Sequence, residues 1–584
     1  MKKILYFSIM VLLLSGCSES FLDTDNLTKK SSANFPGTPA EAQQALTGVY
    51  SSQNTVGTGW NNILLYSEYM SDNRFGGGGM HDPNPQAANY FLVASTNIMS
   101  NIWSGYYQGI YRANTLLESI GNVKGLSAAE RSKVVGETSF LRATYYFDLA
   151  RLFSTPEVID GHQGTVPLII STVPVDAPRA TEDAMYGQIA LDLKTAIDSL
   201  PSAKIDVAWK ADNLGRASKY AAESMMARVF LFYTGYYNKT EIAMPNGSKI
   251  TKDDVKGFVD DVIANSGCTL IPDFRNQWPY AFKNGSATND YKYAKDNNLN
   301  WIGEAANTEN IYEVVFTGFS SNVWGEKSNY VNGFFNTGQR DGTARAGIGH
   351  GWGFGPVNPR LYDDWPNADV RKKGTIYSVD DPTEGLDYVK GADNQWNETM
   401  YMDKKYVPFN VKSAAGKVVN WCHILYAGID ENIQLESVQN MIVIRLADVY
   451  LMGAELGCTK AQAYMDAVRT RAQMPSVPVT LDNIKNERRW ELALEGSRYW
   501  DLLRWYGKEA GVEIKKSSTG AIIYNKGVKT TINEDRTPAL FNNIDARVRA
   551  TGGFNMIPQD QVDLSKVLKQ NPGWTVQSEY MYEF

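Results

Sequence analysis

The two segments that decide the fold class of this chain are IRLADVYLM, from Ile444 to Met452, and IKNERRWELALEGSRYWDLLRW, from Ile484 to Trp505. Apolar residues surround the few charged ones in the first segment, which predicts a helix over residues 440–456 that is buried nearly all round. The second segment carries a ladder of acids and arginines at helical spacing, which predicts a helix over residues 482–506. Both segments therefore indicate helices packed inside a large α-helical protein.

The charged residues of these segments have two possible roles. Arg445, Asp448 and Glu455 fall on one stripe of the first predicted helix, and carboxylates beside an arginine suit acid–base chemistry. A buried helix instead favours ion pairs that tie neighbouring helices together. A glycosidase needs two carboxylates that face each other across a cleft, and no pattern in the sequence points to such a pair. We therefore expect a structural role for these charges and a protein that is not an enzyme.

Helical periodicity also marks most of the N-terminal half. The further predicted helices cover residues 39–55, 97–121, 127–153, 182–200, 214–236 and, in the C-terminal part, 459–473. Thr181 is a suitable N-cap for the helix that begins at residue 182. Successive helices of this kind predict an α-solenoid of tetratricopeptide-like helix pairs, although no strict repeat is visible.

Between about residues 265 and 435 the helical periodicity fades, and glycine, asparagine and tryptophan become frequent. One short strand is expected at residues 311–316, which are rich in β-branched and aromatic residues. Long irregular stretches inside folded proteins are usually functional. The predicted fold is thus mainly α, with long irregular loops and a few short strands. Its expected parts are residues 39–240, a helical region; 241–435, a loop-rich and aromatic-rich ligand-binding region; and 436–584, a second helical region.

Composition narrows the class of function. The chain has 584 residues and a net charge of −7, so it has no basic surplus for nucleic acid, which we do not expect as a partner. Four cysteines and four histidines favour neither a disulfide scaffold nor a His-rich metal site, and we expect no metal and no cofactor. Cys268, Cys422 and Cys458 are expected to be buried free thiols. The aromatic content of 12% suits either a large core or a binding surface.

The N-terminus predicts export and lipidation. Lys2 and Lys3 precede an apolar run from Ile4 to Leu14, which is shorter than the roughly 20 residues that span a bilayer. The run ends in Leu-Ser-Gly before Cys17, as in a bacterial lipobox. We expect residues 1–16 to be a signal peptide, Cys17 to carry lipid in the outer membrane, and residues 17–38 to form a tether. A signal peptide with a chance cysteine is the alternative.

Two groups of loop residues are candidates for ligand binding. Asp72, Asn73 and Arg74 offer acceptors and donors for hydroxyl groups, and the glycines that follow allow close approach of a ligand. Trp324, Tyr330 and Trp352 lie among glycines rather than on helical stripes. Their rings suit stacking against the apolar faces of sugar rings. The alternatives are a solvated turn for the first group and loop packing for the second, while Trp365 is expected in the core.

Several motifs in order along the chain resemble the SusD/RagB family of surface lipoproteins. Besides the two opening segments and Cys17, they are AQQALTGVY from Ala42 to Tyr50, Arg112-Ala113-Asn114, Phe140-Leu141-Arg142-Ala143, Val166-Pro167-Leu168, Val468-Arg469-Thr470-Arg471-Ala472, and Gln570-Asn571-Pro572-Gly573-Trp574. The resemblance covers nearly the whole chain after Cys17.

The resemblance implies a SusD-like fold with four tetratricopeptide-like helix pairs. It also implies a non-catalytic glycan-binding lipoprotein at the surface of the outer membrane, which captures an oligosaccharide or polysaccharide and caps a TonB-dependent, SusC-like transporter. A family member that binds peptide or another non-sugar nutrient remains open, as do a surface glycoside hydrolase and a purely structural lid. The family's sugar contacts come from variable loops, so none transfers securely to a residue of this chain.

Overall fold

A computed structural model provides the structure of the protein. It describes residues 35–57, 63–79, 88–89, 98–159, 161–283, 291–316, 329, 335, 351–385, 395–406, 409–412, 415, 418–420, 438–532 and 544–574. The expected signal peptide, Cys17, Trp324, Tyr330 and Cys422 lie outside these residues. Within them, no helix combines the length and the apolar character needed to cross a membrane.

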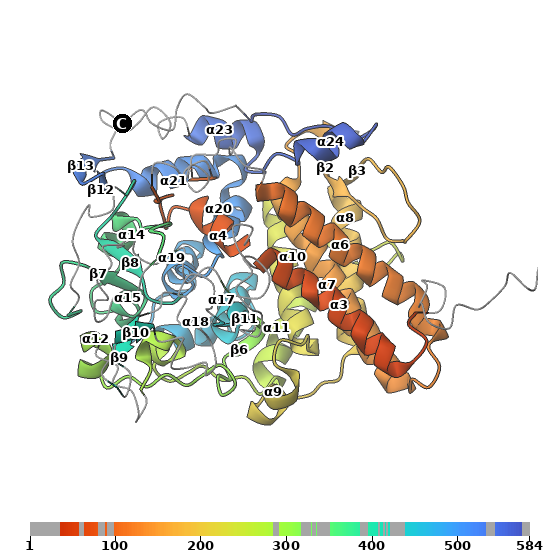
Figure 1. Ribbon diagram of the computed structural model, residues 1–584, viewed down its shortest axis with the longest axis horizontal. Coiled ribbons are helices and arrows are strands. Elements are labelled where there is room, and N and C mark those ends of the chain that lie inside the picture. Colours follow the sequence, from red (N-terminus) through yellow and green to blue (C-terminus); the bar gives the residue numbers. More distant parts are fainter. Residues whose placement is uncertain are drawn as a thin grey trace, which may run out of the picture.

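Long helices form an array in the N-terminal half of the chain (Figure 1). The array consists of α3 (Pro39–Gly57), α6 (Ile98–Ser119), α7 (Ala128–Phe153), α8 (Glu182–Ser199), α10 (Lys219–Tyr236) and α11 (Lys252–Asn265). Each helix packs against the next one in this order. This arrangement confirms the predicted mainly α fold of paired helices.

Side-chain caps explain where several helices of the array begin. Ser127 and Thr251 each form a capping box with the acid three residues later, and the predicted cap Thr181 accepts a hydrogen bond from Ala184 N. Helix α10 begins at Lys219, five residues later than expected, because Ser218 caps it and Gly215 has φ +79°. Smaller elements connect the array: α4 (Ile63–Tyr69), η2 (Ile120–Asn122), β1 (Val158–Ile159), β2 (His162–Pro167), β3 (Arg179–Thr181), α9 (Val207–Asn213), β4 (Ile242–Ala243) and β5 (Lys249–Ile250).

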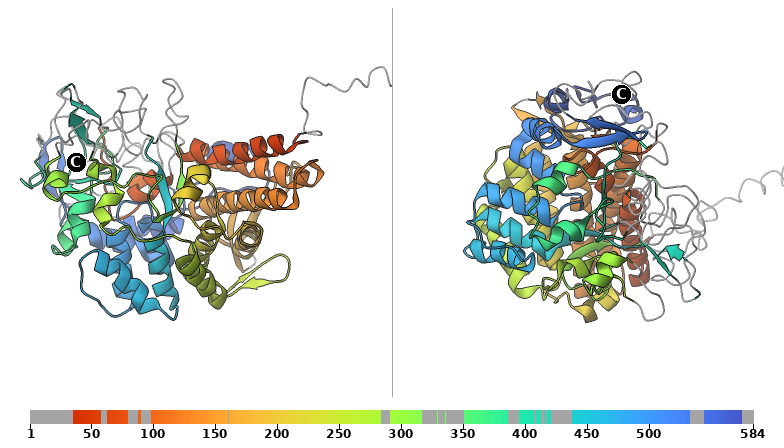
Figure 2. Two further views of the ribbon diagram at one scale, coloured as in Figure 1. Left: turned by 90° about the horizontal axis from the view of Figure 1, so that it is seen from below. Right: turned by 90° about the vertical axis from the view of Figure 1, so that its left-hand side faces the viewer.

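A loop-rich segment follows the array, and its described elements are all short. They are η3 (Phe274–Gln277), η4 (Pro279–Ala281), α12 (Lys292–Asp296), β6 (Asn310–Val314), α14 (Pro359–Asp364), α15 (Val370–Thr375), β7 (Ile376–Ser378), β8 (Tyr401–Asp403), β9 (Asn410–Lys412) and β10 (Val418–Asn420). The expected short strand is confirmed as β6. The views in Figure 2 show these segments beside the C-terminal helices and away from the outer end of the array.

The C-terminal part returns to helices. Its elements are β11 (Met441–Arg445), α17 (Leu446–Leu456), α18 (Ala461–Arg471), α19 (Leu481–Glu491), α20 (Arg498–Tyr506), η5 (Gly507–Glu509), α21 (Ala510–Ser518), β12 (Ile522–Asn525), β13 (Val528–Thr531), α23 (Ile544–Thr551) and α24 (Gln559–Leu564). Helix α17 packs on α11 and α20 packs on α10, so the C-terminal helices extend the N-terminal array.

Two helix predictions in this part were wrong at their boundaries. Residues 441–445 form a strand that pairs antiparallel with β6, because this β-branched stretch completes a ladder with a distant partner. Arg445 therefore precedes helix α17 instead of lying on it. The helix expected over residues 482–506 is two helices, α19 and α20. Leu494 at φ +66° and Gly496 at φ +79° occupy the left-handed region between them, which ends a helix.

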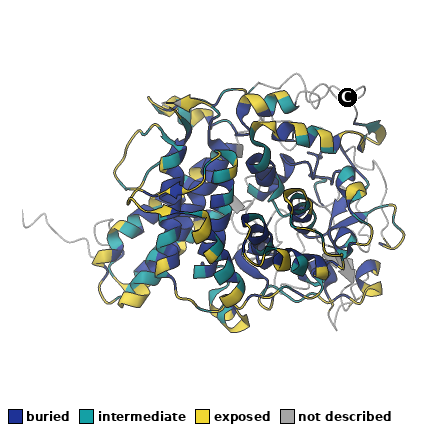
Figure 3. Cartoon of the chain, turned by 180° about the vertical axis from the view of Figure 1, so that it is seen from behind, coloured by how far each residue is buried: buried dark blue, intermediate teal, exposed yellow. Residues whose placement is uncertain are grey.

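One large hydrophobic core runs through the array and continues into β6, β11 and α20. Figure 3 shows the buried residues on helix faces that point toward neighbouring helices. Many aromatic residues belong to this core, including Tyr186, whose ring lies 4.8 Å from that of Tyr233. Cys268 and Cys458 are buried free thiols, as expected.

Candidate functional site

The two loop segments that the sequence marks as ligand candidates lie side by side in the structure. Residues 73–78 pair antiparallel with residues 353–358, and Phe75 N donates to Pro356 O at 2.9 Å. Gly78 N donates to Gly353 O at 2.9 Å, so the ladder continues toward the glycines. We name this pair of segments the loop ladder. It joins parts of the chain that are nearly 300 residues apart.

Gly77 explains why the loop ladder can close. Its φ is +69°, and a Cβ atom at this position would lie 2.5 Å from Gly353 O. Only glycine suits such a backbone and such a close approach. The glycines after Arg74 thus serve the approach of another backbone segment in this structure.

Asp72 is buried beneath the loop ladder. Its two carboxylate oxygens accept from Arg498 Nε at 2.7 Å and Arg498 Nη2 at 2.9 Å. Arg489 Nη2 lies 3.2 Å from the same carboxylate. Burial alone would raise the pKa of Asp72, but the two guanidinium groups hold it well below its usual range. Asn73 is also buried, and its Oδ1 accepts from Arg489 Nε at 3.4 Å.

Arg74 is buried as well and is held on all sides. Its Nη1 donates to Gly355 O at 2.7 Å, and its Nη2 pairs with Asp403 Oδ2 at 2.5 Å. The guanidinium carbon lies 3.7 Å from the centre of the Phe335 ring. The expectation that Asp72, Asn73 and Arg74 contact a ligand is therefore corrected: ion pairs with distant segments draw them inward, where they hold the loops together.

Trp352 differs from these three residues because its side chain is only partly buried. It sits at the end of the loop ladder between Gly351 and Gly353, and its ring lies 5.9 Å from that of buried Phe354 at an interplanar angle of 48°. Of the described residues that the sequence nominates for ligand binding, Trp352 is the one that keeps an accessible part. Trp365 is 1% exposed, which confirms its expected place in the core.

The charged residues of the C-terminal helices form a buried ion-pair network. Glu491 in α19 accepts from three arginines, which are Arg371, Arg445 and Arg471. Arg445 Nε also pairs with Glu495 at 2.8 Å. These contacts confirm the predicted structural role of the charges, since a carboxylate saturated by guanidinium groups is not available to a substrate.

One group of described side chains consists of residue types that can ligate a metal ion. Ligand atoms of His162, Glu182 and Asp183 lie within 4.8 Å of one another. The ammonium of Lys239 already pairs with Asp183 at 2.9 Å and with Glu182 at 3.2 Å. This lysine supplies the positive charge that the carboxylates need, so the group is an ion-pair cluster at the start of α8.

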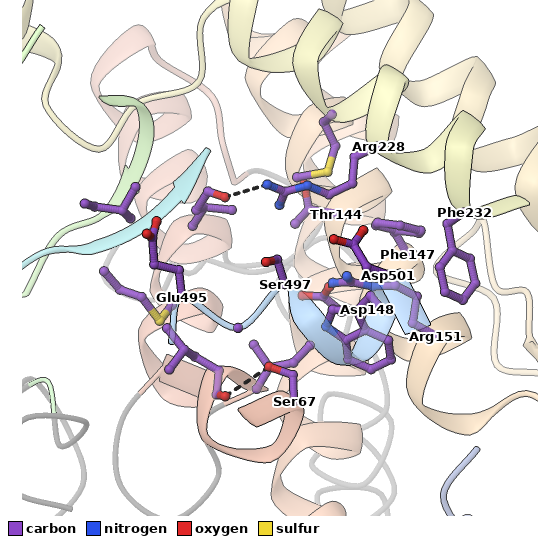
Figure 4. Close-up of a pocket in the computed structure, with 18 of the residues that line it drawn as sticks. Ser67, Thr144, Phe147, Asp148, Arg151, Arg228, Phe232, Glu495, Ser497 and Asp501 are labelled. Atoms are coloured by element: carbon purple, nitrogen blue, oxygen red, sulfur yellow. Dashed lines mark hydrogen bonds and ion pairs between the residues drawn. The ribbon is translucent and has the colours of Figure 1, made fainter. Parts of the chain in front are cut away.

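A cavity of about 120 Å³ lies between the helical array and the C-terminal helices. Figure 4 shows Arg151 and Phe147 of α7, Arg228 of α10, and Ser497 and Asp501 at the start of α20 around it. We name it the junction cavity. No pattern in the sequence predicts it, because its lining comes from segments between residues 53 and 504 that only the fold brings together.

The fold and the loop ladder together define a class of protein: a helical-repeat scaffold that carries long loops with an accessible tryptophan. Two family models match separate parts of the chain. One is described as the SusD family and matches residues 308–574, and the other is described as starch-binding, associating with the outer membrane, and matches residues 21–231.

Curated relatives agree with this match. A SusD-like protein from Bacteroides ovatus is 23% identical over 521 residues, which cover 86% of this chain and 82% of the relative. A SusD-like protein from Formosa agariphila is 26% identical over 530 residues, which cover 85% of this chain and 89% of the relative. The chain belongs to the SusD family.

Solved structures share the fold. A laminarin-binding SusD-like protein is 26% identical, with a TM-score of 0.67 and coverage of 92% of this chain and 100% of its own. Surface glycan-binding protein A from Bacteroides thetaiotaomicron, solved in complex with laminarihexaose, is 19% identical with a TM-score of 0.64. It covers 91% of this chain and 99% of its own. At this lower identity the likeness concerns the fold alone.

Proposed function

We propose that this protein is a non-catalytic glycan-binding lipoprotein at the surface of the outer membrane. Trp352 carries the proposal, because it is a partly buried tryptophan at the end of the loop ladder between two glycines. Such a ring can stack on the apolar face of a sugar. The laminarin-binding SusD-like protein of the same fold supports a β-glucan as the first ligand to test.

The wider role in nutrient uptake belongs to the same proposal. The protein captures an oligosaccharide and delivers it to a TonB-dependent, SusC-like transporter, while lipid on Cys17 holds it at the membrane. The family description that names association with the outer membrane supports this location. The proposed ligand contacts are Trp352 together with Trp324 and Tyr330.

Affinity gels and calorimetry with laminarin and a panel of plant, host and microbial glycans test the capture role. Saturable binding without breakdown of the glycan is the expected result. Trp352→Ala should weaken binding by about 10-fold, which corresponds to ~1.4 kcal/mol and is within the range of one ring contact. Trp324→Ala and Tyr330→Ala should weaken it in the same direction.

Trp209→Ala is the matched control, because Trp209 of α9 is also a partly buried tryptophan at the edge of the main core. It should leave glycan affinity unchanged. Equal affinity of Trp352→Ala and wild type would refute the site. Glycan breakdown would favour a hydrolase, and absence of binding to every glycan would favour a peptide or another nutrient.

A further inference from the structure

The junction cavity has apolar walls on most sides. They come from both halves of the chain, namely Leu64, Phe147, Met225, Phe232, Met441 and Trp500. A cavity of ~150 Å³ lined by apolar side chains admits benzene, a molecule of six heavy atoms. The junction cavity measures about 120 Å³, so it suits a ligand of about that size or slightly smaller.

The carboxylates that line the junction cavity are already paired. Asp501 accepts from Arg488 Nε at 2.8 Å and from Arg504 Nε at 2.9 Å. Asp148 accepts from Tyr106 at 2.7 Å and from Arg151. The third acid, Glu495, is bound by Lys405 and Arg445. The acids therefore offer little capacity for a further donor from a ligand.

Arg151, in contrast, does not use all of its donors in hydrogen bonds to other described residues. The residue is 8% exposed, and its guanidinium carbon lies 4.2 Å from the centre of the Phe147 ring and 4.4 Å from that of Trp500. One of its terminal nitrogens pairs with Asp148. Its Nε is buried without a hydrogen-bond partner among the described residues. An N–H this enclosed is out of reach of a ligand. The other terminal nitrogen, Nη1, is not fully buried and donates to none of the described residues, so it is the donor that Arg151 offers to the cavity that it lines.

The start of helix α20 adds a second feature that favours an anion. Ser497 occupies the N-cap position and lines the cavity, yet its side chain makes no capping hydrogen bond. Figure 4 shows Ser497 between Glu495 and Asp501, with the Arg151 side chain on the same side of the cavity as Asp501. The positive end of a helix dipole and a free hydroxyl both stabilise a carboxylate.

We propose that the junction cavity binds a short aliphatic monocarboxylate of about four carbons, for which butyrate is the probe. The carboxylate accepts from Arg151 and Ser497 at the start of α20, and the alkyl chain packs against Met225 and Met441. Butyrate has six heavy atoms and matches the cavity, whereas a uronic acid has about twice as many and is too large. The proposal is independent of glycan binding at the loop ladder.

Calorimetry and thermal unfolding of the purified protein with sodium butyrate test this proposal, with sodium chloride at equal ionic strength as the blank. Butyrate should bind saturably at one site per chain and raise the Tm by several degrees, because a ligand that binds only the folded state stabilises it. Butyramide has the same shape without the charge and should bind at least 10-fold more weakly. Glucuronate should not bind.

Variants of the lining residues locate the site. Arg151→Gln should weaken butyrate binding at least 10-fold, and Ser497→Ala should weaken it about threefold. Met441→Phe fills the space for the alkyl chain and should abolish binding while the fold is retained, so it decides the matter if Arg151→Gln does not fold. Trp352→Ala is the control and should leave butyrate affinity unchanged.

Three outcomes would overturn the proposal. They are no saturable binding of butyrate, equal affinity for butyrate and butyramide, and butyrate binding of wild-type affinity in folded Ser497→Ala and Met441→Phe variants. The first removes the ligand, the second removes the need for an anion, and the third places the ligand elsewhere.

Discussion

Replacing Glu491 by glutamine tests how the charged network holds the loop-rich segment on the helices. Glu491 is 0% exposed and accepts from Arg371 of α15, Arg445 of β11 and Arg471 of α18. Burial alone would raise the pKa of its carboxyl, but the three guanidinium groups hold the pKa well below its usual range. The carboxylate of α19 thus joins α15 of the loop-rich segment to β11 and α18 of the C-terminal part.

The expected loss of unfolding free energy follows from the interactions that Glu491→Gln removes. The amide has the same shape, but it lacks the charge and turns an NH₂ group toward guanidinium donors. Each hydrogen bond to a charged group contributes ~1.5–3 kcal/mol, and removing one member of a buried ion pair typically costs ~3–5 kcal/mol. Glu309, Glu487 and Glu495 still pair with these arginines, so the loss does not multiply by three. We expect a loss of about 3–5 kcal/mol of unfolding free energy.

Urea unfolding at pH 7, followed by circular dichroism, measures this loss. Asp253→Asn is the control, because the Asp253 side chain is 89% exposed and a surface pair such as Asp253–Lys256 contributes only ~0–1 kcal/mol. A loss below ~1 kcal/mol for Glu491→Gln would refute the reasoning, since it would show that water or the other acids satisfy the arginines. At temperatures where the variant is folded, its glycan affinity should equal that of wild type.

Three further predictions concern pH and glycine. Burial, together with the carboxylate of Asp261, raises the pKa of Glu223 from 4.5 to about 8. The folded protein therefore favours the neutral form of Glu223, and the stability that this form contributes at low pH is lost as the pH rises from 4.5 to 8. The unfolding free energy of wild type relative to Glu223→Gln should therefore fall by up to ~5 kcal/mol over this window, and urea titrations that give parallel pH profiles would contradict it. Gly77→Ala should destabilise the protein by ~1–3 kcal/mol and weaken glycan binding. An alanine is strained at this positive φ, and its Cβ would clash with Gly353 O and disturb the loop ladder. Unchanged melting and binding would argue against this. Gly48→Ala in helix α3 should stabilise the protein by ~0.5–1 kcal/mol in thermal unfolding, since nothing lies within 4 Å of the added Cβ; a lower Tm would count against this account.

Local features of the sequence predicted most of the helical array. A cap such as Thr181 acts within three residues of a helix start, and apolar periodicity repeats within two turns. Both signals are complete within a short window, which is why α3, α6, α7 and α8 begin and end within a few residues of their predicted bounds. The buried role of the charged C-terminal residues also followed from the apolar residues around them.

The candidate site was predictable only in part. Trp352 could be nominated because its neighbours are glycines, and the structure leaves part of its side chain accessible. Asp72 and Arg74 have the same polar surroundings in the sequence that an exposed binding loop would have. Their burial depends on Arg498 and Asp403, which lie more than 300 residues away along the chain.

By itself the sequence determined the class of fold, because helix periods, caps and charge ladders are short-range properties. The tertiary structure alone decided that Arg445 ends a strand, that Arg74 lies inside, and that Arg151 and Ser497 share a cavity. Each of these outcomes depends on an interaction between distant segments. Such a contact forms only where the burial and pairing of both partners outweigh the entropy lost on closing a long loop, and neither partner's local sequence carries that balance.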